Sequence, residues 1–480
     1  MGNPAERNIS LGMRGLWPLE NGSTVVIVGG GPGGAGCALA LKNLAREQGK
    51  SIRVILYEGK IFEGSIHYNQ CAGVLSPPII DILERELLIP FPWDIVQREV
   101  KGYVLHSDSE QILLREEGEP TYAVRRVNFD EYLLKEAGAR GVEVVQSRVT
   151  DVEFFGRGVM VYSESNQCRA DVVVGAFGMD DGTARIFERS TSYRQPPFLS
   201  TIVTKIHPGE DFMGRFGNFI HAFLPPLDRI EFGAITPKMN HLTVNIAGAS
   251  ITWESMEEFL AYPPVRGLLP PGFRGGKIRG ESVEGNSLFS EKGDGLLFFK
   301  GRFPLGVGRG FYGDRYVIVG DAAGLLRPFK GKGINMSILT ALQAARTMMN
   351  SGVSREAFGR NYRSACREVI SDIPYGKVLR FFAVRSSRLH LLDAIINLAK
   401  RNPILERALF NSVSAHKSFK KIFKETRDPG LFLKLLGLFA FHSVKRILSP
   451  KYVSAVYTTS ERGQTVPSAV KGSIEPVKRV

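Results

Sequence analysis

The sequence has little of what marks a disulfide-stabilised or metal-binding protein. Of its 480 residues only four are cysteines, Cys37, Cys71, Cys168 and Cys366, and no two of them form a CxxC pair. This spacing argues against a disulfide framework, a zinc site and an iron–sulfur cluster, so we expect no metal. It fits a reducing, cytoplasmic setting.

Long hydrophobic runs and targeting signals are also lacking. The apolar run Leu431–Phe441 is too short to span a bilayer as a helix. Residues 1–22 mix charged residues with proline and glycine and lack the apolar core of a signal peptide, so we do not expect secretion. No nucleic-acid-binding motif is present, and nucleic acid is therefore not an expected partner.

Positive charge is abundant but unevenly placed. Residues 377–480 hold 20 of the 62 basic residues and 6 of the 48 acidic ones, which accounts for the whole net charge of +14. Because this quarter is also rich in Leu, Ile and Phe, it predicts a peripheral contact with anionic lipid at the inner face of the membrane. A solvated basic helical surface is the open alternative.

A parallel βαβ unit is predicted near the N-terminal end. The apolar, β-branched run Thr24–Val28 predicts a strand, residues 34–48 have a helical pattern, and Ile52–Tyr57 predicts a second strand that ends at Glu58. A strand, glycine turn, helix and strand within about 35 residues are typical of a right-handed βαβ crossover.

The turn of this unit carries a dinucleotide-binding pattern. Gly29, Gly31 and Gly34 form GxGxxG, with Pro32 between them. The first glycine permits the tight turn, the second lets the backbone approach a pyrophosphate, and the third allows the helix to pack closely. The positive end of the helix then faces the phosphates, and Glu58 is placed to accept hydrogen bonds from the ribose hydroxyls.

A second motif favours FAD over NAD. Residues 316–324 read YVIVGDAAG, a strand that ends in Gly320 and Asp321, and residues 328–334 read PFKGKGI before a helix. The carboxylate can hold ribityl hydroxyls, and N–H groups at the helix start can face the flavin N1 and C2 carbonyl. An ordinary helix N-cap is the alternative for Asp321. The expected cofactor-binding residues here are Gly320, Asp321, Pro328, Gly331, Gly333 and Ile334.

Four motifs in this order resemble the geranylgeranyl reductase family, within the FAD-dependent oxidoreductases shaped like p-hydroxybenzoate hydroxylase. They are GxGxxG, Arg126-x-x-Phe129-Asp130-x-x-Leu133, residues 171–178 (DVVVGAFG), and GDAAG with PxxGxGI. The resemblance implies that Arg126 contacts the FAD near its phosphates or ribityl chain and that Gly178 lies beside the cofactor. A surface arginine at a helix start is the alternative for Arg126.

Two positions depart from this family's pattern. Phe177 stands where the strand-end motif usually carries an acid, and residues 221–226 (HAFLPP) match the aromatic substrate motif YxWxFP only loosely. The sequence therefore indicates the cofactor and the fold more closely than it indicates the substrate.

The resemblance also places the Cys71, Ala72 and Gly73 loop beside the flavin. Cysteine thiols have an ordinary pKa of about 8.5 and are mostly protonated at neutral pH, so a cysteine here can donate a proton after hydride transfer to a carbon–carbon double bond. A small thiol that only lines the pocket is the alternative. His221 is a second candidate donor, although a single histidine in a strand is more often simply packed.

These motifs predict an α/β fold with a Rossmann-type FAD-binding domain, a parallel sheet, an inserted antiparallel-sheet substrate domain and a C-terminal helical region. The expected segments are an N-terminal extension at 1–22, the first part of the FAD-binding domain at 23–195 with small inserted strands near 97–125, the substrate domain at 196–310, the return of the FAD-binding domain at 311–353, a basic helical region at 354–458 and a mobile tail at 459–480.

The leading hypothesis is a reductase that saturates double bonds of a prenyl or isoprenoid lipid by hydride transfer from reduced FAD. The chemistry would come from the flavin, with an electron donor such as NAD(P)H or ferredoxin, and an apolar small molecule or lipid as substrate. Two alternatives are an aromatic-type monooxygenase that uses NAD(P)H and O2, and a membrane-surface flavoprotein that relays electrons.

Overall fold

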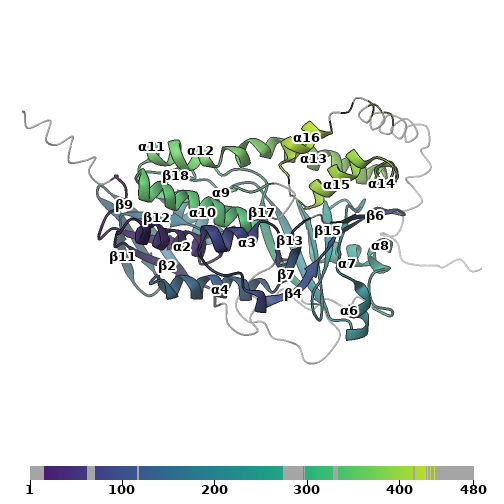
Figure 1. Ribbon diagram of the computed structural model, residues 1–480, viewed down its shortest axis with the longest axis horizontal. Helices are drawn as coiled ribbons and strands as arrows, with labels where there is room; N and C mark the ends of the chain where they lie inside the picture. Colours follow the sequence, from purple (N-terminus) through teal and green to yellow (C-terminus); the bar gives the residue numbers. More distant parts are fainter. Residues whose placement is uncertain are drawn as a thin grey trace, which may run out of the picture.

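The computed structural model describes residues 16–61, 71–115, 118–273, 296, 298–327, 333–414 and 417–426, and the single positions 428, 430, 433 and 437. The expected tail at 459–480, nearly all of the apolar run at 431–441, and the candidate residues Pro328 and Gly331 lie outside this part of the chain. Figure 1 shows the arrangement of the elements.

A six-stranded sheet forms one half of the molecule, and its strand order is β18-β19-β12-β1-β2-β8. All of its pairings are parallel except that of β18 with β19. Central strands that are covered on both faces need continuous apolar sequence, and β12 is buried at every position. The strands are β1 (Thr24–Val28), β2 (Arg53–Glu58), β8 (Glu143–Gln146), β12 (Val172–Gly175), β18 (Tyr312–Gly313) and β19 (Tyr316–Ile318).

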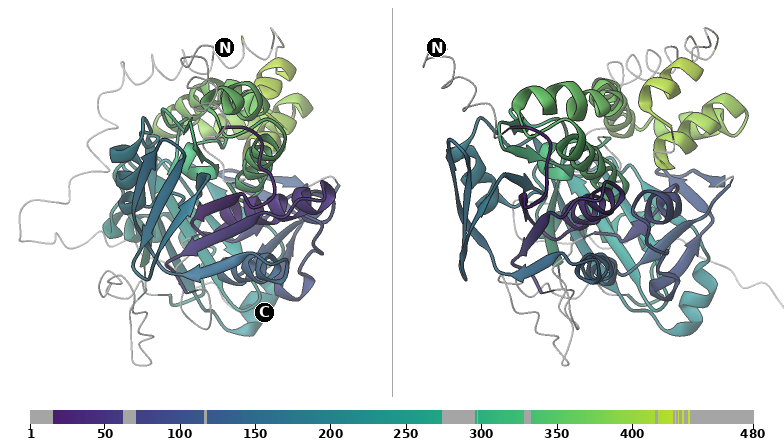
Figure 2. Two further views of the ribbon diagram at one scale, coloured as in Figure 1. Left: turned by 90° about the vertical axis from the view of Figure 1, so that its left-hand side faces the viewer. Right: turned by 60° about the vertical axis from the view of Figure 1, so that its left-hand side comes forward.

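Helices cover one face of this sheet, and a small sheet covers the other (Figures 1 and 2). The covering helices are α2 (Pro32–Glu47) and α10 (Gly333–Asn350), and the small sheet has the order β11-β10-β9. The predicted βαβ unit is confirmed, but α2 begins two residues earlier than expected because Pro32 occupies its first turn. The small sheet consists of β9 (Val149–Phe155), β10 (Gly158–Ser163) and β11 (Gln167–Ala170).

A seven-stranded sheet forms the other half, in the order β17-β13-β16-β15-β14-β5-β6. It is antiparallel except that β14 pairs with β5 in parallel, so the sheet recruits two strands from the region near 97–125. Its strands are β5 (Gly102–His106), β6 (Gln111–Arg115), β13 (Phe198–Ile206), β14 (Ile220–Phe223), β15 (Phe232–Pro237), β16 (Leu242–Gly248) and β17 (Phe298–Pro304).

A third small sheet and several helices connect the two halves. The sheet has the order β3-β7-β4, from β3 (Val74–Leu75), β7 (Thr121–Val124) and β4 (Val96–Val100). The helices with their bounds are α3 (Ile79–Asp81), α4 (Arg126–Ala139), α5 (Asp181–Ser190), α6 (Glu210–Phe216), α7 (Trp253–Ala261), α8 (Pro263–Arg266) and α9 (Gly320–Ala323). Short π and 3-10 turns occupy Ile82–Glu86 and Trp93–Ile95.

The C-terminal helices lie along the top of both halves in Figure 1. The longest, α13 (Arg367–Arg388), is anchored to the seven-stranded sheet where Arg380 pairs with Glu231 and the Ser387 hydroxyl donates to the Leu224 carbonyl at 2.6 Å. No helix in the described ranges is long and apolar enough to cross a membrane. The others are α11 (Arg355–Ala357), a π turn at Phe358–Tyr362, α12 (Arg363–Ala365), α14 (Leu392–Ala399), α15 (Pro403–Ser414) and α16 (Phe419–Glu425).

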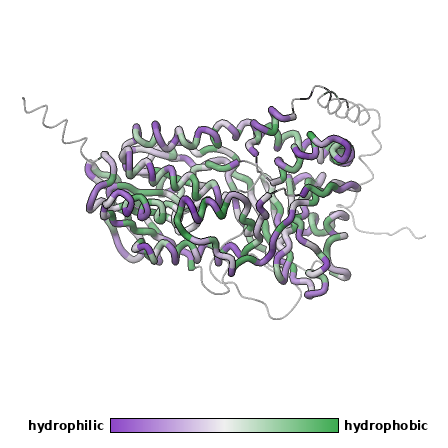
Figure 3. The backbone as a smooth tube through the Cα atoms, viewed as in Figure 1, coloured by the Kyte–Doolittle hydropathy of each residue, from purple (hydrophilic) through white to green (hydrophobic). Residues whose placement is uncertain are grey.

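The expected fold class is confirmed, with a parallel Rossmann-type sheet, a separate and largely antiparallel sheet, and C-terminal helices. Coloured by hydropathy, the backbone is hydrophobic mainly along the inner strands and changes repeatedly between hydrophobic and hydrophilic along the outer helices (Figure 3). This is the pattern of strands buried on both faces and of helices that bury one side. The exact boundaries between the expected segments remain predictions.

Two glycines in helices are expected to respond in opposite ways to substitution. A Cβ at Gly36 in α2 would lie 3.3 Å from the Ile338 side chain of α10, whereas Gly138 in α4 faces open space. Gly36→Val should lower the free energy of unfolding by about 1–3 kcal/mol through overpacking. Gly138→Ala should raise it by up to about 1 kcal/mol. Urea unfolding checks both, and equal effects would contradict this packing.

Candidate functional site

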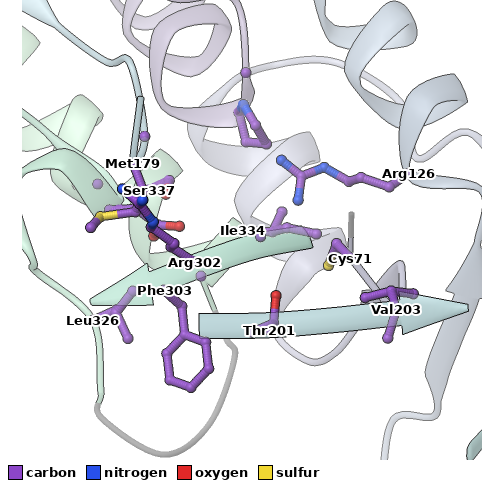
Figure 4. Close-up of a pocket in the computed structure, with 18 of the residues that line it drawn as sticks. Cys71, Arg126, Met179, Thr201, Val203, Arg302, Phe303, Leu326, Ile334 and Ser337 are labelled. Atoms are coloured by element: carbon purple, nitrogen blue, oxygen red, sulfur yellow. The ribbon is translucent and has the colours of Figure 1, made fainter. Parts of the chain in front are cut away.

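A cavity of about 1500 Å³ lies between the parallel sheet and the seven-stranded sheet. Its walls include Gly29 and Gly31 from the first glycine turn, and Gly320, Asp321 and Gly333 from the second. The two motifs, nearly 300 positions apart in the sequence, therefore border the same space. Figure 4 shows the part of this cavity around Cys71 and Arg126.

Close backbone contacts make the first turn dependent on its glycines. Gly29 has a φ of 107°, and a Cβ there would lie 2.6 Å from the Ala176 carbonyl oxygen. A Cβ at Gly34 would lie only 1.8 Å from the Gly29 carbonyl oxygen. At Gly31, by contrast, nothing lies within 4 Å of an added Cβ, so the backbone there is open to a ligand in the cavity. Pro32 follows as the first residue of α2.

Glu58 lies at the end of β2 and lines the cavity. One carboxylate oxygen accepts the Gly30 N–H at 2.6 Å, and the other accepts the Lys60 N–H at 2.7 Å. Burial raises the pKa of Glu58, and these two donors lower it again only in part. Each oxygen keeps a second lone pair, so the fixed carboxylate can still accept hydrogen bonds from a ligand.

The second turn presents a carboxylate with one buried oxygen that accepts no hydrogen bond from the described part of the chain. Asp321 lies at the start of α9, and this oxygen is its Oδ1 atom. A Cβ at Gly333, the first residue of α10, would lie 3.4 Å from the same atom. Burial raises the pKa of Asp321, while the positive charge of Arg126 lowers it. A buried, unpaired polar atom costs free energy, so Asp321 fits a position that needs a hydrogen-bond donor from a ligand.

The Gly320 and Ile334 positions complete this second turn. Gly320 has a φ of 61°, and a Cβ there would lie 2.6 Å from the Ser337 hydroxyl oxygen. Its N–H donates to the Thr340 hydroxyl at 3.0 Å, which ties the turn to α10. Ile334 lines the cavity from the first turn of α10.

Arg126 and Gly178 also border the cavity, and their contact with a flavin, which the resemblance implies, stays a prediction. The Arg126 Nε donates to Asp130 at 2.7 Å, which fixes the guanidinium one helical turn away. Burial alone would lower the pKa of Arg126, but the charge of Asp130 raises it above its usual range. Gly178 has a φ of 59° and open space where a Cβ would lie. Arg126 is therefore not a free surface arginine, which was the alternative interpretation.

Phe177 packs with other rings and adds no polar atom to the cavity. Its ring centroid lies 5.2 Å from that of Phe187 and 5.9 Å from that of Tyr193. The acid that the family pattern has at this position is therefore replaced by core packing.

Cys71, Ala72 and the flanking Val74 line the cavity, with Cys71 beside Arg126 and Ile334 in Figure 4. The Gly73 N–H points at the Cys71 sulfur at 3.4 Å. Gly73 has a φ of 67°, and a Cβ there would lie 2.2 Å from the Val124 carbonyl oxygen. Cys37 is fully buried in α2, and burial raises its pKa to about 12, which fits a purely structural thiol.

The structure does not bring His221 to the cavity. Its Nδ1 lies 2.8 Å from the Nε2 of His106, and both rings are buried. Burial lowers the pKa of His221 to about 3 and that of His106 to about 4. The His221 ring instead packs against the rings of His106 and Phe216, with centroids 5.1 and 5.0 Å away. His221 as a proton donor therefore has no structural support, and the packed alternative fits its surroundings.

The seven-stranded sheet supplies a mainly apolar wall that also carries polar side chains such as Thr201 and Arg302, and Asn245 is a polar residue in this wall that the sequence reasoning missed. Thr201, Val203 and Ala234 line the cavity together with Asn245 of β16. Within the described ranges no hydrogen-bond partner reaches the buried Oδ1 of Asn245. The signal was present, since β16 reads LTVNIAG, with a single amide inside an otherwise buried strand.

Lys238 is a second group that the sequence reasoning missed. It follows β15, is buried, and donates from Nζ to the Val124 carbonyl at 2.7 Å. A Cβ at Gly73 would lie 3.0 Å from this Nζ, so Lys238 packs behind the Cys71 loop. Burial and the charge of Lys205 lower the pKa of Lys238 to about 7.

Several solved structures described as reductase-like, flavoprotein or flavin-dependent proteins share this fold. A geranylgeranyl bacteriochlorophyll reductase-like protein from Thermoplasma acidophilum has a TM-score of 0.63 and 19% identity, over 87% of this chain and 99% of its own. A flavoprotein/dehydrogenase from Cytophaga hutchinsonii has a TM-score of 0.57 and 18% identity, over 90% of this chain and 100% of its own. A flavin-dependent brominase has a TM-score of 0.57 and 16% identity, over 84% of this chain and 98% of its own.

Sequence comparison finds a distant relative. An uncharacterised protein from Methanosarcina barkeri is 24% identical over 361 residues, which cover 73% of this chain and 80% of that protein. No protein-family model matches the chain. The resemblance inferred from the motifs is thus confirmed at the level of the fold.

The lowered pKa of Lys238 predicts a specific pH dependence of stability. Between pH 7 and about pH 10 the unfolded lysine binds a proton that the folded one has released, so this group makes stability rise with pH. Lys238→Met should therefore stabilise the protein most near pH 7. The difference in the free energy of unfolding between the variant and the wild type should shrink as pH rises, by up to about 1.4 kcal/mol per pH unit. Urea unfolding at several pH values checks this, and a pH-independent difference would contradict it.

Proposed function

We propose that the cavity holds one FAD, with its adenosine at Glu58 and its ribityl chain at Asp321. The observation that carries this proposal is that Glu58 and the unpartnered Asp321 oxygen both border a cavity that the two glycine turns also line. The open backbone at Gly31, at the N-terminal end of the 16-residue helix α2, suits a pyrophosphate. The structural relatives described as flavoproteins support the same cofactor.

We further propose that the protein is a reductase that saturates carbon–carbon double bonds of an apolar, prenyl-type chain. When bound, reduced FAD supplies a hydride to one carbon of the double bond. The wall opposite the glycine turns supports an apolar substrate, because Ile202, Val203, Ala234 and Phe303 border the cavity from that side. The fold shared with a reductase-like protein supports this chemistry.

The chain's own residues would bind the cofactor, orient the substrate and protonate the substrate carbon. Asp321 and Glu58 would fix the cofactor, and Arg126, held by Asp130, would place a positive charge beside the reacting region. Cys71 would deliver the proton to the second carbon, because its thiol borders the cavity and is exposed to it. The apolar wall would exclude water from the reacting carbons.

An aromatic-type monooxygenase is the second candidate. The fold shared with a flavin-dependent brominase fits a monooxygenase as well as it fits a reductase. The two differ in their need for oxygen: a monooxygenase consumes O2 and NAD(P)H to form a hydroxylated product, whereas a reductase works without O2.

Removal of the Asp321 carboxylate should weaken FAD binding while the protein stays folded. Asp321→Ala removes the acceptor for a ligand hydroxyl, and the FAD dissociation constant should rise about 10- to 100-fold. Flavin fluorescence quenching on titration measures this constant. Asp211→Ala, on the exposed surface of α6, is the control and should leave it unchanged. An unaltered constant in Asp321→Ala would contradict the assigned position.

The reductase itself is tested under anaerobic conditions with a geranylgeranylated lipid and chemically reduced enzyme. We expect a mass gain of two hydrogens for each double bond. Cys71→Ser should slow this reaction about 100-fold or more, the usual scale for loss of a general acid, and keep its FAD. The control Cys168→Ser alters a thiol on β11, away from the cavity lining. A hydroxylated product that requires O2 would support the monooxygenase instead.

A further inference from the structure

Helix α13 carries two apolar stripes side by side. Leu379 and Ala383 line the cavity. Val378 and Phe382, each one position earlier in the sequence, are exposed. Successive residues of an α-helix lie about 100° apart, so the inner and outer stripes adjoin along the same helix. The helix therefore forms a wall between the cavity and the surroundings.

The outer stripe exposes more large apolar side chains than a solvated helix needs. Tyr375, Val378, Phe381 and Phe382 have exposed fractions of 37%, 45%, 64% and 47%. Tyr375, Val378 and Phe382 follow the spacing i, i+3 and i+7, which places them on one face. A contiguous apolar patch of this kind usually marks a contact with another molecule.

Helix α15 borders the same end of the cavity. Leu409 and Val413 line the cavity from this helix, together with its polar residue Ser412. In Figure 1, α13, α15 and α16 lie close together above the seven-stranded sheet. The cavity thus reaches two helices of the basic C-terminal region at the position of the outer apolar stripe.

Positive charge surrounds this stripe. From Ile373 to Arg388 the sequence has four basic residues and no acidic one. Lys377, Arg385 and Arg388 of this stretch are exposed. The Phe423 ring of α16 lies 5.7 Å from that of Tyr375, so the exposed lysines of α16 are close by. Those lysines are Lys420, Lys421 and Lys424.

Aromatic rings flanked by lysine and arginine fit the interface of an anionic bilayer. The rings can bury among the upper acyl chains while the cations stay with the phosphate groups. A protein partner fits less well, because lysine is depleted in protein–protein interfaces. An apolar substrate dissolved in the bilayer would meet the inner stripe next.

We propose that α13, with α15 and α16, docks on an anionic lipid bilayer and forms the portal through which the apolar substrate passes into the cavity. The proposal rests on the proposed lipid reductase function and adds the partner and the route of entry.

The test is flotation of the flavin-loaded full-length protein with vesicles of phosphatidylcholine, with and without phosphatidylglycerol. The wild type should float with the anionic vesicles, and added salt should weaken the binding because it screens the cations. Phe381→Ser/Phe382→Ser should lower the partition coefficient about tenfold or more, from the loss of two buried rings. Met239→Ser is the control and should float like the wild type, because Met239 is as exposed as Phe381, at 64%, but lies in the loop between β15 and β16.

A second measurement ties docking to entry. The double variant should turn over a lipid embedded in vesicles at least about tenfold more slowly, in line with its weaker binding, and the same lipid in detergent at the normal rate. The proposal is overturned if the wild type fails to float, or if the double variant floats equally well. It is also overturned if the wild type is a dimer, the double variant is a monomer and lipid binding is unchanged. In that case a second copy of the chain would cover the outer stripe of α13.

The two measurements distinguish failure of the proposed reductase function from failure of the docking surface. Flotation with no reduction of any lipid would reject the reductase and keep the docking surface. Reduction in detergent without flotation would reject the docking surface and keep the reductase.

Discussion

The whole site depends on the order of three neighbouring strands. Strands β1 and β19 both pair in parallel with β12 and therefore flank it. Parallel strands end at the same edge of a sheet, so the turns after β1 and β19 lie only two strand spacings apart, about 10 Å. A right-handed crossover fixes this arrangement once each strand has its partner. Any ligand that bridges the two turns must be long and must bear donors at both ends.

The second constraint is the contrast between the two walls of the cavity. The glycine turns present backbone groups, Glu58 and Asp321, while the seven-stranded sheet presents mainly aliphatic and aromatic side chains. Polar side chains interrupt this wall at Thr201, Asn245 and Arg302, and the buried Asn245 Oδ1 accepts no hydrogen bond from the described residues. A polar cofactor on one side and an apolar chain on the other satisfy both walls. The helices α13 and α15 close the end of this space, and their outer surface continues the apolar character.

The parallel half of the molecule was predictable because its signals are local. Strand β1, the glycine turn and the Gly320–Asp321 turn each depend on backbone space that a side chain would fill, so the residue types are nearly forced. Arg126 was predictable as a cavity residue only from the resemblance, because its partner Asp130 lies one helical turn away on α4 and gives no cofactor signal by itself.

The remaining features depend on long-range register, which the sequence does not display. The strands at 102–115 join a sheet with strands beyond residue 198, because β5 pairs with β14. The same pairing brings His106 against His221 and away from the cavity, which the sequence alone could not show. The surroundings of Lys238 also come from long-range packing, because its partner Val124 belongs to β7 of the separate three-stranded sheet. Asn245 lies on β16 between β13 and β15, and tertiary packing sets the contact of α13 with the cavity.

The most direct measurement of the central claim is an experimental structure of the protein grown with FAD. We expect one FAD in each chain, with its ribose at Glu58, its pyrophosphate at Gly31 and its ribityl chain at Asp321, so that it bridges the ends of β1 and β19. A flavin held by only one of the two turns, or a cavity that takes up no flavin at saturating concentration, would contradict the account.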